Sequence, residues 1–221
     1  MTNRISSFAY SLIGLAIPLA LAVPTYAVDQ PRLTAAESKL AGLEQSLGPR
    51  LGLCAIDTTD GSQIRHRADE RFPFCSTFKV ILAGAILERS REVPDLLQQR
   101  ITYKKDDLVT YSPISEKHVA DGMTVSELCA AAIQYSDNTA ANLLIKILGG
   151  PEAVTAFARS IGNKTFQLDR WETELNTALP DDLRDTVTPA AMAQSLQNLA
   201  LGDALSKTEQ TQLNDWMRGN T

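Results

Sequence analysis

Ser76 and Lys79 lie three residues apart in the segment PFCSTFKV, directly before the apolar run VILAGAIL at 80–87. Because this run is apolar all round, it predicts a helix over 76–90 that is buried on every side. At the first turn of a helix the backbone N–H groups are unpaired and the macrodipole is positive. Ser76 could therefore act as a nucleophile whose own N–H stabilises an oxyanion, with a desolvated Lys79 relaying its proton. The alternative is a chance tetrad with a capping serine and a solvated lysine.

Two further sets of polar residues could complete such a site. SDN at 136–138 falls between two predicted helices, so Ser136 and Asn138 could project a hydroxyl and an amide into a pocket. The alternative is that this turn caps the following helix. Glu172 and Asn176 are four residues apart in RWETELN and could hold one water molecule between them. The alternative is an acidic side chain in a solvated loop.

The helices that must position these residues are marked by capping signals. Capping-box pairs begin at Thr34, Thr124 and Ser206, and Thr188 precedes a proline at a first helical position. Glycines mark several of the helix ends. Helices are expected at 35–47, 76–90, 125–135, 138–148, 151–161, 189–201 and 207–218.

The rest of the chain predicts little regular structure. RLGLCAID at 50–57 and SQIRHRA at 62–68 predict a β-hairpin, and no later segment predicts another strand. Residues 166–187 have no regular period, and a segment of this length in a compact domain is usually functional. Four apolar side chains argue against disorder there and predict a packed Ω-type loop: Trp171, Leu175, Leu179 and Leu183.

Composition and the N-terminus limit the classes of function. The 221 residues carry a net charge of −5 and no basic stripe, which argues against a nucleic-acid partner. Arg4, an apolar run at 8–23 and the small residues of TYA at 25–27 predict a secretory signal cleaved after Ala27. A single membrane-spanning anchor is the alternative.

Cysteine and histidine usage argues against a metal centre. Cys54, Cys75 and Cys129 are isolated, and no pair has metal-ligand spacing, so neither a metal nor another cofactor is expected. Three cysteines in an exported protein leave one thiol free or one partner outside this chain. His66 lies among arginines in a polar stretch and is expected on a solvated surface.

Five motifs give the chain a recognisable pattern. In this combination and order the chain resembles the class A serine β-lactamases from about Ala35 to its last residue: STFK at 76–79, YSPISEKHVADGMTV at 111–125, YSDN at 135–138, GGP at 149–151 and DRWETELN at 169–176. The resemblance implies an α+β fold of the β-lactamase/transpeptidase-like type. In it an all-helical domain lies beside an α/β sandwich domain with an antiparallel sheet, and the site lies between them.

The resemblance also implies catalytic roles by position. Ser76 would attack the lactam carbonyl and become acylated, while Lys79 and Ser136 would shuttle protons, Ser136 serving the leaving nitrogen. Glu172, with Asn176, would orient the water that hydrolyses the acyl-enzyme. Whether Lys79 or Glu172 is the base for acylation stays open.

Further residues would bind substrate or hold the loop. By the same resemblance Asn138 would bind the substrate's side-chain amide, and Tyr111 would wall the pocket entrance; an ordinary packed tyrosine is the alternative. Arg170 and Asp185 resemble the ion pair at the base of the Ω-type loop. Breaking that pair would leave a buried charge without a partner.

The Lys-Thr/Ser-Gly motif of the family is absent, and few strands are predicted. The chain is therefore expected to be the N-terminal portion of a class A β-lactamase, with little or no hydrolysis of its own. Its expected division is a signal peptide at 1–27, a partial α/β domain at 28–87 and 202–221, and an all-helical domain at 88–201 that includes the loop at 166–187.

The cysteines fit particular members of the family. Carbapenem-hydrolysing members resemble this chain in having a cysteine before the nucleophile, paired with one just after the third motif. Cys75 is therefore expected without its partner here. Cys129 is expected to be a buried free thiol, and Cys54 a residue of a strand core.

The implied partners are a small-molecule β-lactam and water, acting on a monomer that is periplasmic or secreted and has no stable membrane anchor. One rival is a penicillin-binding transpeptidase or carboxypeptidase, against which Glu172 in its loop argues. Another is a β-lactam sensor that is acylated without turnover, which would usually carry transmembrane helices.

Overall fold

The computed structural model describes residues 30–220, and the predicted signal segment lies outside them. Within this range every helix expected from the sequence is present. The α-helices are α1 (Gln30–Leu47), α2 (Phe78–Arg89), α3 (Val125–Gln134), α4 (Asn138–Leu148), α5 (Pro151–Ser160), α6 (Pro189–Ala200) and α7 (Lys207–Arg218). The helix predicted from residue 76 begins as a short 3-10 turn, Cys75–Thr77, and becomes α-helical at Phe78.

Most of the predicted helix starts are confirmed. Thr124 and Ser206 each form a full capping box with the glutamate three residues on, and the Thr188 hydroxyl accepts from the N–H of Ala191 at the start of α6. The start predicted at Thr34 is wrong, because α1 is already helical from Gln30. In the sequence, a capping-box pattern inside a helix looks the same as one at the start of a helix.

The predicted hairpin is present as β1 (Leu53–Ile56) and β2 (Gln63–His66), which pair antiparallel. The expectation of no later strand is wrong. Four two-residue strands follow: β3 (Phe72–Pro73), β4 (Arg100–Ile101), β5 (Met123–Thr124) and β6 (Thr186–Val187). β3 pairs with β6 and β4 with β5, both antiparallel. Strands of two residues are too short to show an alternating pattern, so the sequence does not reveal them.

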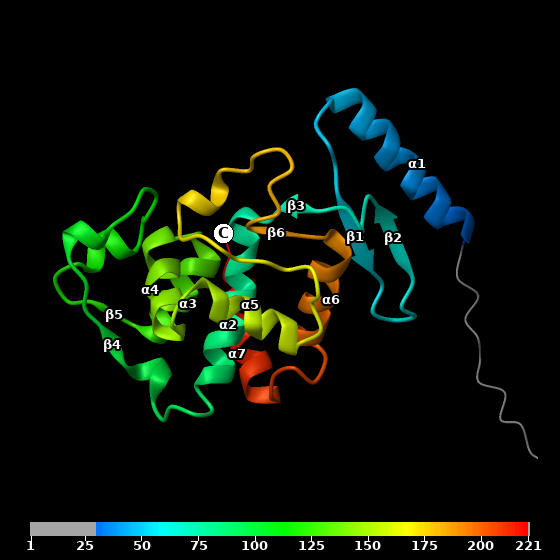
Figure 1. The fold of residues 1–221 in the computed structure, drawn as a ribbon. Helices are drawn as coiled ribbons and strands as arrows, with labels where there is room; N and C mark the ends of the chain where they lie inside the picture. The colour runs from blue at the N-terminus through cyan, green and yellow to red at the C-terminus, as the bar shows by residue number, and fades with distance from the viewer. Residues whose placement is uncertain (1–29, 221) are drawn as a thin grey trace, which may run out of the picture.

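Helix α2 forms the centre of the core, with other helices packed around it (Figure 1). Its apolar side chains are buried as predicted, apart from Val80, which is only partly buried. Burying each large one contributes roughly 1.5–3 kcal/mol. Gly84 allows close packing on one side, since a Cβ there would lie 3.0 Å from Leu199 and 3.2 Å from Phe157. The buried side chains and this close packing therefore fix α2 against the helices around it.

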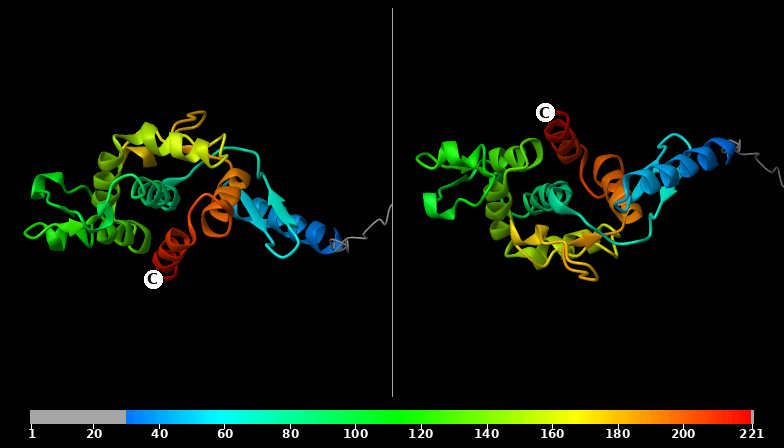
Figure 2. Two further views of the ribbon diagram at one scale, coloured as in Figure 1. Left: turned by 90° about the horizontal axis from the view of Figure 1, so that it is seen from below. Right: turned by 90° about the horizontal axis from the view of Figure 1, so that it is seen from above.

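The hairpin lies at one end of the molecule and the β4–β5 pair at the other (Figures 1 and 2). Helix α1 packs on β2 and α6 packs on β1. His66 is not solvated as expected, because its side chain is largely buried against Glu44, with 2.8 Å between Nε2 and Oε2. The division into two domains stays a prediction. None of the helices within residues 30–220 combines the length and apolar character of a membrane span.

The segment 166–187 is ordered by fewer apolar contacts than predicted. Leu175 is fully buried in a 3-10 turn, Glu174–Asn176, but Trp171, Leu179 and Leu183 are 38%, 54% and 57% exposed. The ends of the segment are close together, because the Gln167 N–H donates to the carbonyl of Thr186. Polar contacts at its base therefore contribute to the conformation of this segment.

Candidate active site

A sharp turn before α2 presents Ser76. Cys75 has a left-handed backbone conformation with φ of 44°, and Phe74 is buried with its ring stacked on Phe166 at 4.9 Å between centroids. The Thr77 N–H and hydroxyl both donate to the carbonyl of Phe74, at 3.0 and 2.6 Å. Ser76 therefore lies on a short 3-10 turn at the start of a buried helix. Its neighbours on both sides, Phe74 and Thr77, are held by packing and hydrogen bonds.

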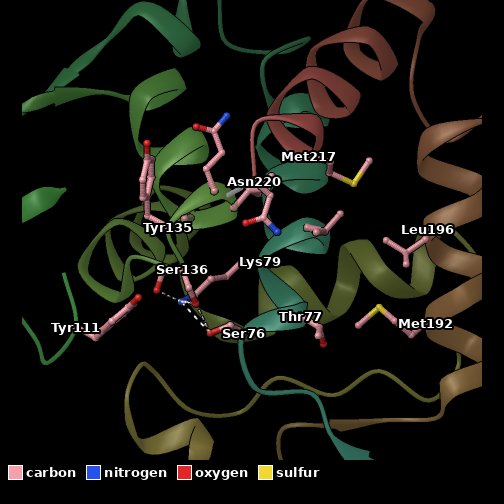
Figure 3. A pocket seen from close by; sticks show the side chains of 14 residues that line it. Ser76, Thr77, Lys79, Tyr111, Tyr135, Ser136, Met192, Leu196, Met217 and Asn220 are labelled. Atoms are coloured by element: carbon pink, nitrogen blue, oxygen red, sulfur yellow. Dashed lines mark hydrogen bonds between the residues drawn. The ribbon is translucent and has the colours of Figure 1, made fainter. Parts of the chain in front are cut away.

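Lys79 brings the candidate side chains together. Its side chain is 2% exposed, so the alternative of a solvated lysine is wrong. Its ammonium donates to Ser76 Oγ at 3.2 Å, Ser136 Oγ at 3.3 Å and the Ser136 carbonyl at 2.8 Å. It also donates to Asn138 Oδ1 at 2.6 Å. Three N–H groups are thus shared among four oxygens, and Figure 3 shows Lys79 with the two serines.

Burial lowers the pKa of Lys79, and the nearby charge of Glu172 offsets part of this effect. The folded protein therefore gives up the Lys79 proton at a lower pH than a free lysine side chain does. Such a group can exchange a proton with a neighbouring hydroxyl more readily than an exposed lysine.

The turn between α3 and α4 supplies a second hydroxyl. Ser136 has a φ of 55°, and its Oγ donates to Ser76 Oγ at 2.7 Å. The capping role considered for this turn belongs to Asp137, whose Oδ1 accepts from the Ala140 N–H at 2.8 Å. Capping and pocket lining are therefore both present, on neighbouring residues.

Glu172 faces the same cluster from the Ω-type loop. It is buried, so it is not a solvated loop acid. Its Oε2 accepts from Asn176 Nδ2 at 2.7 Å, and its Oε1 lies 3.1 Å from Lys79 Nζ. That second contact lacks the geometry of a hydrogen bond, and within residues 30–220 Oε1 is a buried acceptor without a donor. A buried carboxylate oxygen of this kind favours a bound water molecule.

Asn142 is a site residue that sequence reasoning missed. Its Oδ1 accepts from the N–H of Glu172 and its Nδ2 donates to the carbonyl of Glu172, both at 2.9 Å. The two bonds fix the loop backbone at Glu172 to α4. Asn142 follows Asn138 by one helical turn, so two asparagines four apart on an apolar helix were the signal that could have revealed it.

The base of the loop is held by the expected ion pair. Arg170 Nε donates to Asp185 Oδ2, and the Asp185 side chain is completely buried. Asp185 Oδ1 also accepts from the N–H groups of Asp169 and Arg170, at 2.9 and 3.1 Å. Asp182 lies 3.8 Å from Arg170 and 2.8 Å from Arg184.

Ser76, Lys79 and Ser136 line one part of a pocket of about 650 Å³. Tyr111 lies at its mouth with 63% of its surface exposed, so it is not an ordinary packed tyrosine. The opposite wall is apolar and comes from α6 and α7 (Figure 3). Residues of this pocket that the sequence did not indicate include Thr77, Tyr135, Met192, Leu196, Met217 and Asn220.

The cysteines have the states expected from the sequence, except that Cys54 is half-buried and not a core residue. Cys129 is a buried free thiol, and Cys75 is exposed and free. Although Cys75 is exposed as a residue, partial desolvation of its thiol and, to a lesser extent, the charge of Glu172 raise the pKa of that thiol. Within residues 30–220 no group of three or more His, Cys, Asp or Glu side chains could hold a metal ion.

Comparison with known proteins agrees with the resemblance. A profile of a family described as "Beta-lactamase enzyme family" matches residues 35–221. The chain is 59% identical to Beta-lactamase CTX-M-97 of Escherichia coli over 185 residues, which is 84% of this chain and 64% of that protein. It is 56% identical to the Carbapenem-hydrolyzing beta-lactamase KPC of Klebsiella oxytoca over 181 residues, or 82% of this chain and 62% of that protein.

A solved structure extends the comparison to the fold. The structure of an Ancestral (GNCA) Beta-lactamase class A matches with a TM-score of 0.82 and 59% identity, over 84% of this chain and 72% of that chain. The predicted β-lactamase/transpeptidase-like α+β fold is thereby confirmed. The chain spans less than two thirds of the length of the two curated relatives named above. The profile and the relatives show that the chain belongs to the beta-lactamase enzyme family, and the likeness to the ancestral enzyme places it in class A of that family.

Proposed function

We propose that the protein of which this chain is all or part hydrolyses β-lactams through a serine acyl-enzyme and so confers β-lactam resistance. The observation that carries the proposal is the cluster of Ser76, Ser136 and Glu172 around the buried ammonium of Lys79. The names of these relatives support the substrate class. Monomeric action in the periplasm or outside the cell, after cleavage near Ala27, belongs to the same proposal.

In the acylation step Ser76 Oγ forms a bond to the lactam carbonyl carbon and the ring C–N bond breaks. The Ser76 proton passes to a neighbouring base, Ser136 gives its own proton to the leaving nitrogen, and the protonated base restores the Ser136 proton, so proton number is conserved. Contacts of 2.7 Å from Ser136 and 3.2 Å from Lys79 to Ser76 Oγ support this relay. The Ser76 N–H, at the start of its helical turn, supports an oxyanion on the attacked carbonyl.

In the deacylation step water attacks the ester carbon and Ser76 leaves as a hydroxyl. Glu172 takes one proton from the water and passes it on to Ser76 Oγ as the ester C–O bond breaks. The second water proton is released to solvent when the new carboxyl group of the product ionises. The unpaired Oε1 of Glu172, with Asn176 bound to Oε2, supports this role. Asn138 borders the cluster through its contact with Lys79, and this position supports binding of the substrate's side-chain amide.

Intact-protein mass spectrometry after mixing with benzylpenicillin tests the proposal. The expected result is an adduct of one whole penicillin on Ser76, absent from Ser76→Ala. An adduct that forms and then disappears supports a hydrolase, whereas one that persists supports a penicillin-binding or sensing protein. No adduct on Ser76 would overturn the proposal. Because the readout is the covalent mass, it is independent of whether residues 28–221 alone turn over substrate, for which little or no hydrolysis stays the prediction.

A further inference from the structure

Two buried hydroxyls outside the catalytic cluster close a ring of hydrogen bonds next to Tyr111, one of the residues that line the pocket. Ser112 and Thr139 lie 2.7 Å apart between their Oγ atoms, and both residues are buried. The Val109 N–H donates to Thr139 Oγ1 at 2.9 Å, and Ser112 Oγ donates to the Val109 carbonyl at 2.8 Å. The ring thus joins the loop before Ser112 to the first turn of α4.

The chemistry of the ring fixes the direction of each bond. A backbone N–H can only donate and a carbonyl can only accept. The single hydroxyl proton of Ser112 is therefore donated to the Val109 carbonyl. Since Ser112 has no second proton, Thr139 must be the donor in the bond between the two hydroxyls. The Thr139 N–H also donates to Ser112 Oγ, at 3.2 Å. Removing either hydroxyl leaves buried partners unsatisfied, at about 1 kcal/mol or more.

The ring borders the two residues that face a substrate. The Asn138 N–H donates to the Tyr111 carbonyl at 3.0 Å, and Asn138 Nδ2 donates to the Thr110 carbonyl at 2.9 Å. Since Nδ2 is held by the loop, Oδ1 must face Lys79, which it meets at 2.6 Å. Tyr111 has a φ of 65°, a conformation that persists only where its surroundings enforce it.

We infer that Ser112 and Thr139 are positioning residues that set Tyr111 and the Asn138 amide for the acylamino side chain of a β-lactam. This inference rests on the proposed function. Neither hydroxyl touches the reacting atoms. The ring acts on recognition of the side chain, while the contacts of Lys79 with Ser76 and Ser136 involve neither of its hydroxyls. Loss of the ring should therefore affect β-lactams that carry an acylamino group and should spare those that carry a bare amine.

The matched substrates are benzylpenicillin and 6-aminopenicillanic acid, which lacks the acyl group. In Thr139→Val the rate of Ser76 acylation by benzylpenicillin at subsaturating concentration should fall about tenfold, the factor for one lost hydrogen bond. The rate with 6-aminopenicillanic acid should stay within about twofold of the unmodified protein. Ser112→Ala should behave in the same way, and Thr139→Ser, which keeps the hydroxyl, should restore the rate.

Ser195→Ala is the control, because it removes a buried hydroxyl that bonds Asn163 and the Ala191 carbonyl far from this loop. It should leave the ratio of the two acylation rates unchanged. Equal losses with both substrates in Thr139→Val, or no loss with either, would overturn the inference.

Hydrogen exchange gives a second readout that needs no substrate. Peptides containing Val109 and Asn138 should exchange faster in Thr139→Val and at the original rate in Thr139→Ser, while peptides of α5 stay unchanged. If no penicillin adduct forms on Ser76 in the unmodified protein, the proposed function fails, and exchange alone decides on the ring. Unchanged exchange in Thr139→Val would mean that the ring positions nothing.

Discussion

The ammonium of Lys79 and the carboxylate of Glu172 face each other at 3.1 Å, and both side chains are almost completely excluded from solvent. Removing two charges from water is costly, and the cost is offset only when the ions are well paired and hydrogen-bonded. Lys79 is well supplied with acceptors, whereas Glu172 keeps one unbonded oxygen. The unpaired oxygen of Glu172 therefore suits the proposed reaction with water better than it suits stabilisation of the fold.

Replacing Glu172 by glutamine should trap the acyl-enzyme. The amide keeps the size of the side chain but cannot take a proton from water, so deacylation should slow by at least about a hundredfold, within the range for a lost general base. Time-resolved mass spectrometry after mixing with benzylpenicillin measures the lifetime of the Ser76 adduct. Glu174→Gln, an exposed neighbour, should leave that lifetime unchanged. Equal lifetimes in Glu172→Gln and the unmodified protein would contradict the assigned role.

Asn142→Ala should affect deacylation more than acylation. The substitution removes both bonds that hold the Glu172 backbone, while every contact of Lys79 with Ser76 and Ser136 remains. The adduct should therefore form at a similar rate and persist about tenfold longer or more, since two hydrogen bonds are lost. Parallel measurements of adduct formation and decay check this. Asn214→Ala serves as the control, because it removes an amide that donates to the Ala200 carbonyl at the end of α6. Equal slowing of both steps in Asn142→Ala would show a general loss of structure instead.

Arg170 and Arg184 both contact Asp182 but should differ in their effect on stability. Arg170→Ala leaves the buried carboxylate of Asp185 without its charged partner, at a cost of about 3 kcal/mol in the free energy of unfolding. Arg184 is half exposed and its ion pair is screened by solvent, so Arg184→Ala should lower the free energy of unfolding far less than Arg170→Ala. Urea unfolding at neutral pH separates the two. Similar small losses would mean that the two backbone N–H groups alone satisfy Asp185.

The helices and the nucleophile could be predicted because their signals are local. Capping residues, apolar runs and helix-ending glycines lie within a few positions of the features they mark, and the helix at Phe78–Arg89 is an example. Ser76, Lys79 and Ser136 were found because their motifs are short and ordered along the chain. The Thr34 start failed for the same reason, since a local pattern does not show what precedes it.

The contacts that orient the site could not be predicted in this way. Asn142 reaches Glu172, and Thr139 reaches Ser112, across long stretches of sequence. Such pairs depend on how α4 packs against two separate loops, and no spacing rule encodes that packing. The two-residue strand β6, which pairs with the segment before Ser76, was missed because its register is set by the fold around it.

Glu209 should make the attachment of α7 sensitive to acid. Its carboxylate accepts from Arg91 Nε at 2.7 Å and from the Ser206 N–H at 2.7 Å, so α7 is tied to the chain that follows α2. The bond to Arg91 is the main cause that lowers the pKa of Glu209 from 4.5 to about 2. Because the pKa is lower in the folded than in the unfolded chain, this contribution to stability is complete above the unfolded value. It is lost as the pH falls from 4.5 to about 2.

Glu209→Gln isolates the charge, since glutamine can still complete the capping box with Ser206. At pH 7 the variant should unfold at a lower urea concentration than the unmodified protein. The gap between their midpoints should then narrow as the pH falls through the same window, from 4.5 towards 2. Arg91→Gln should remove the same contribution, so adding it to Glu209→Gln should change little. A gap that stays constant from pH 7 to the acid limit would show that Glu209 acts through its shape or its cap and not through its charge.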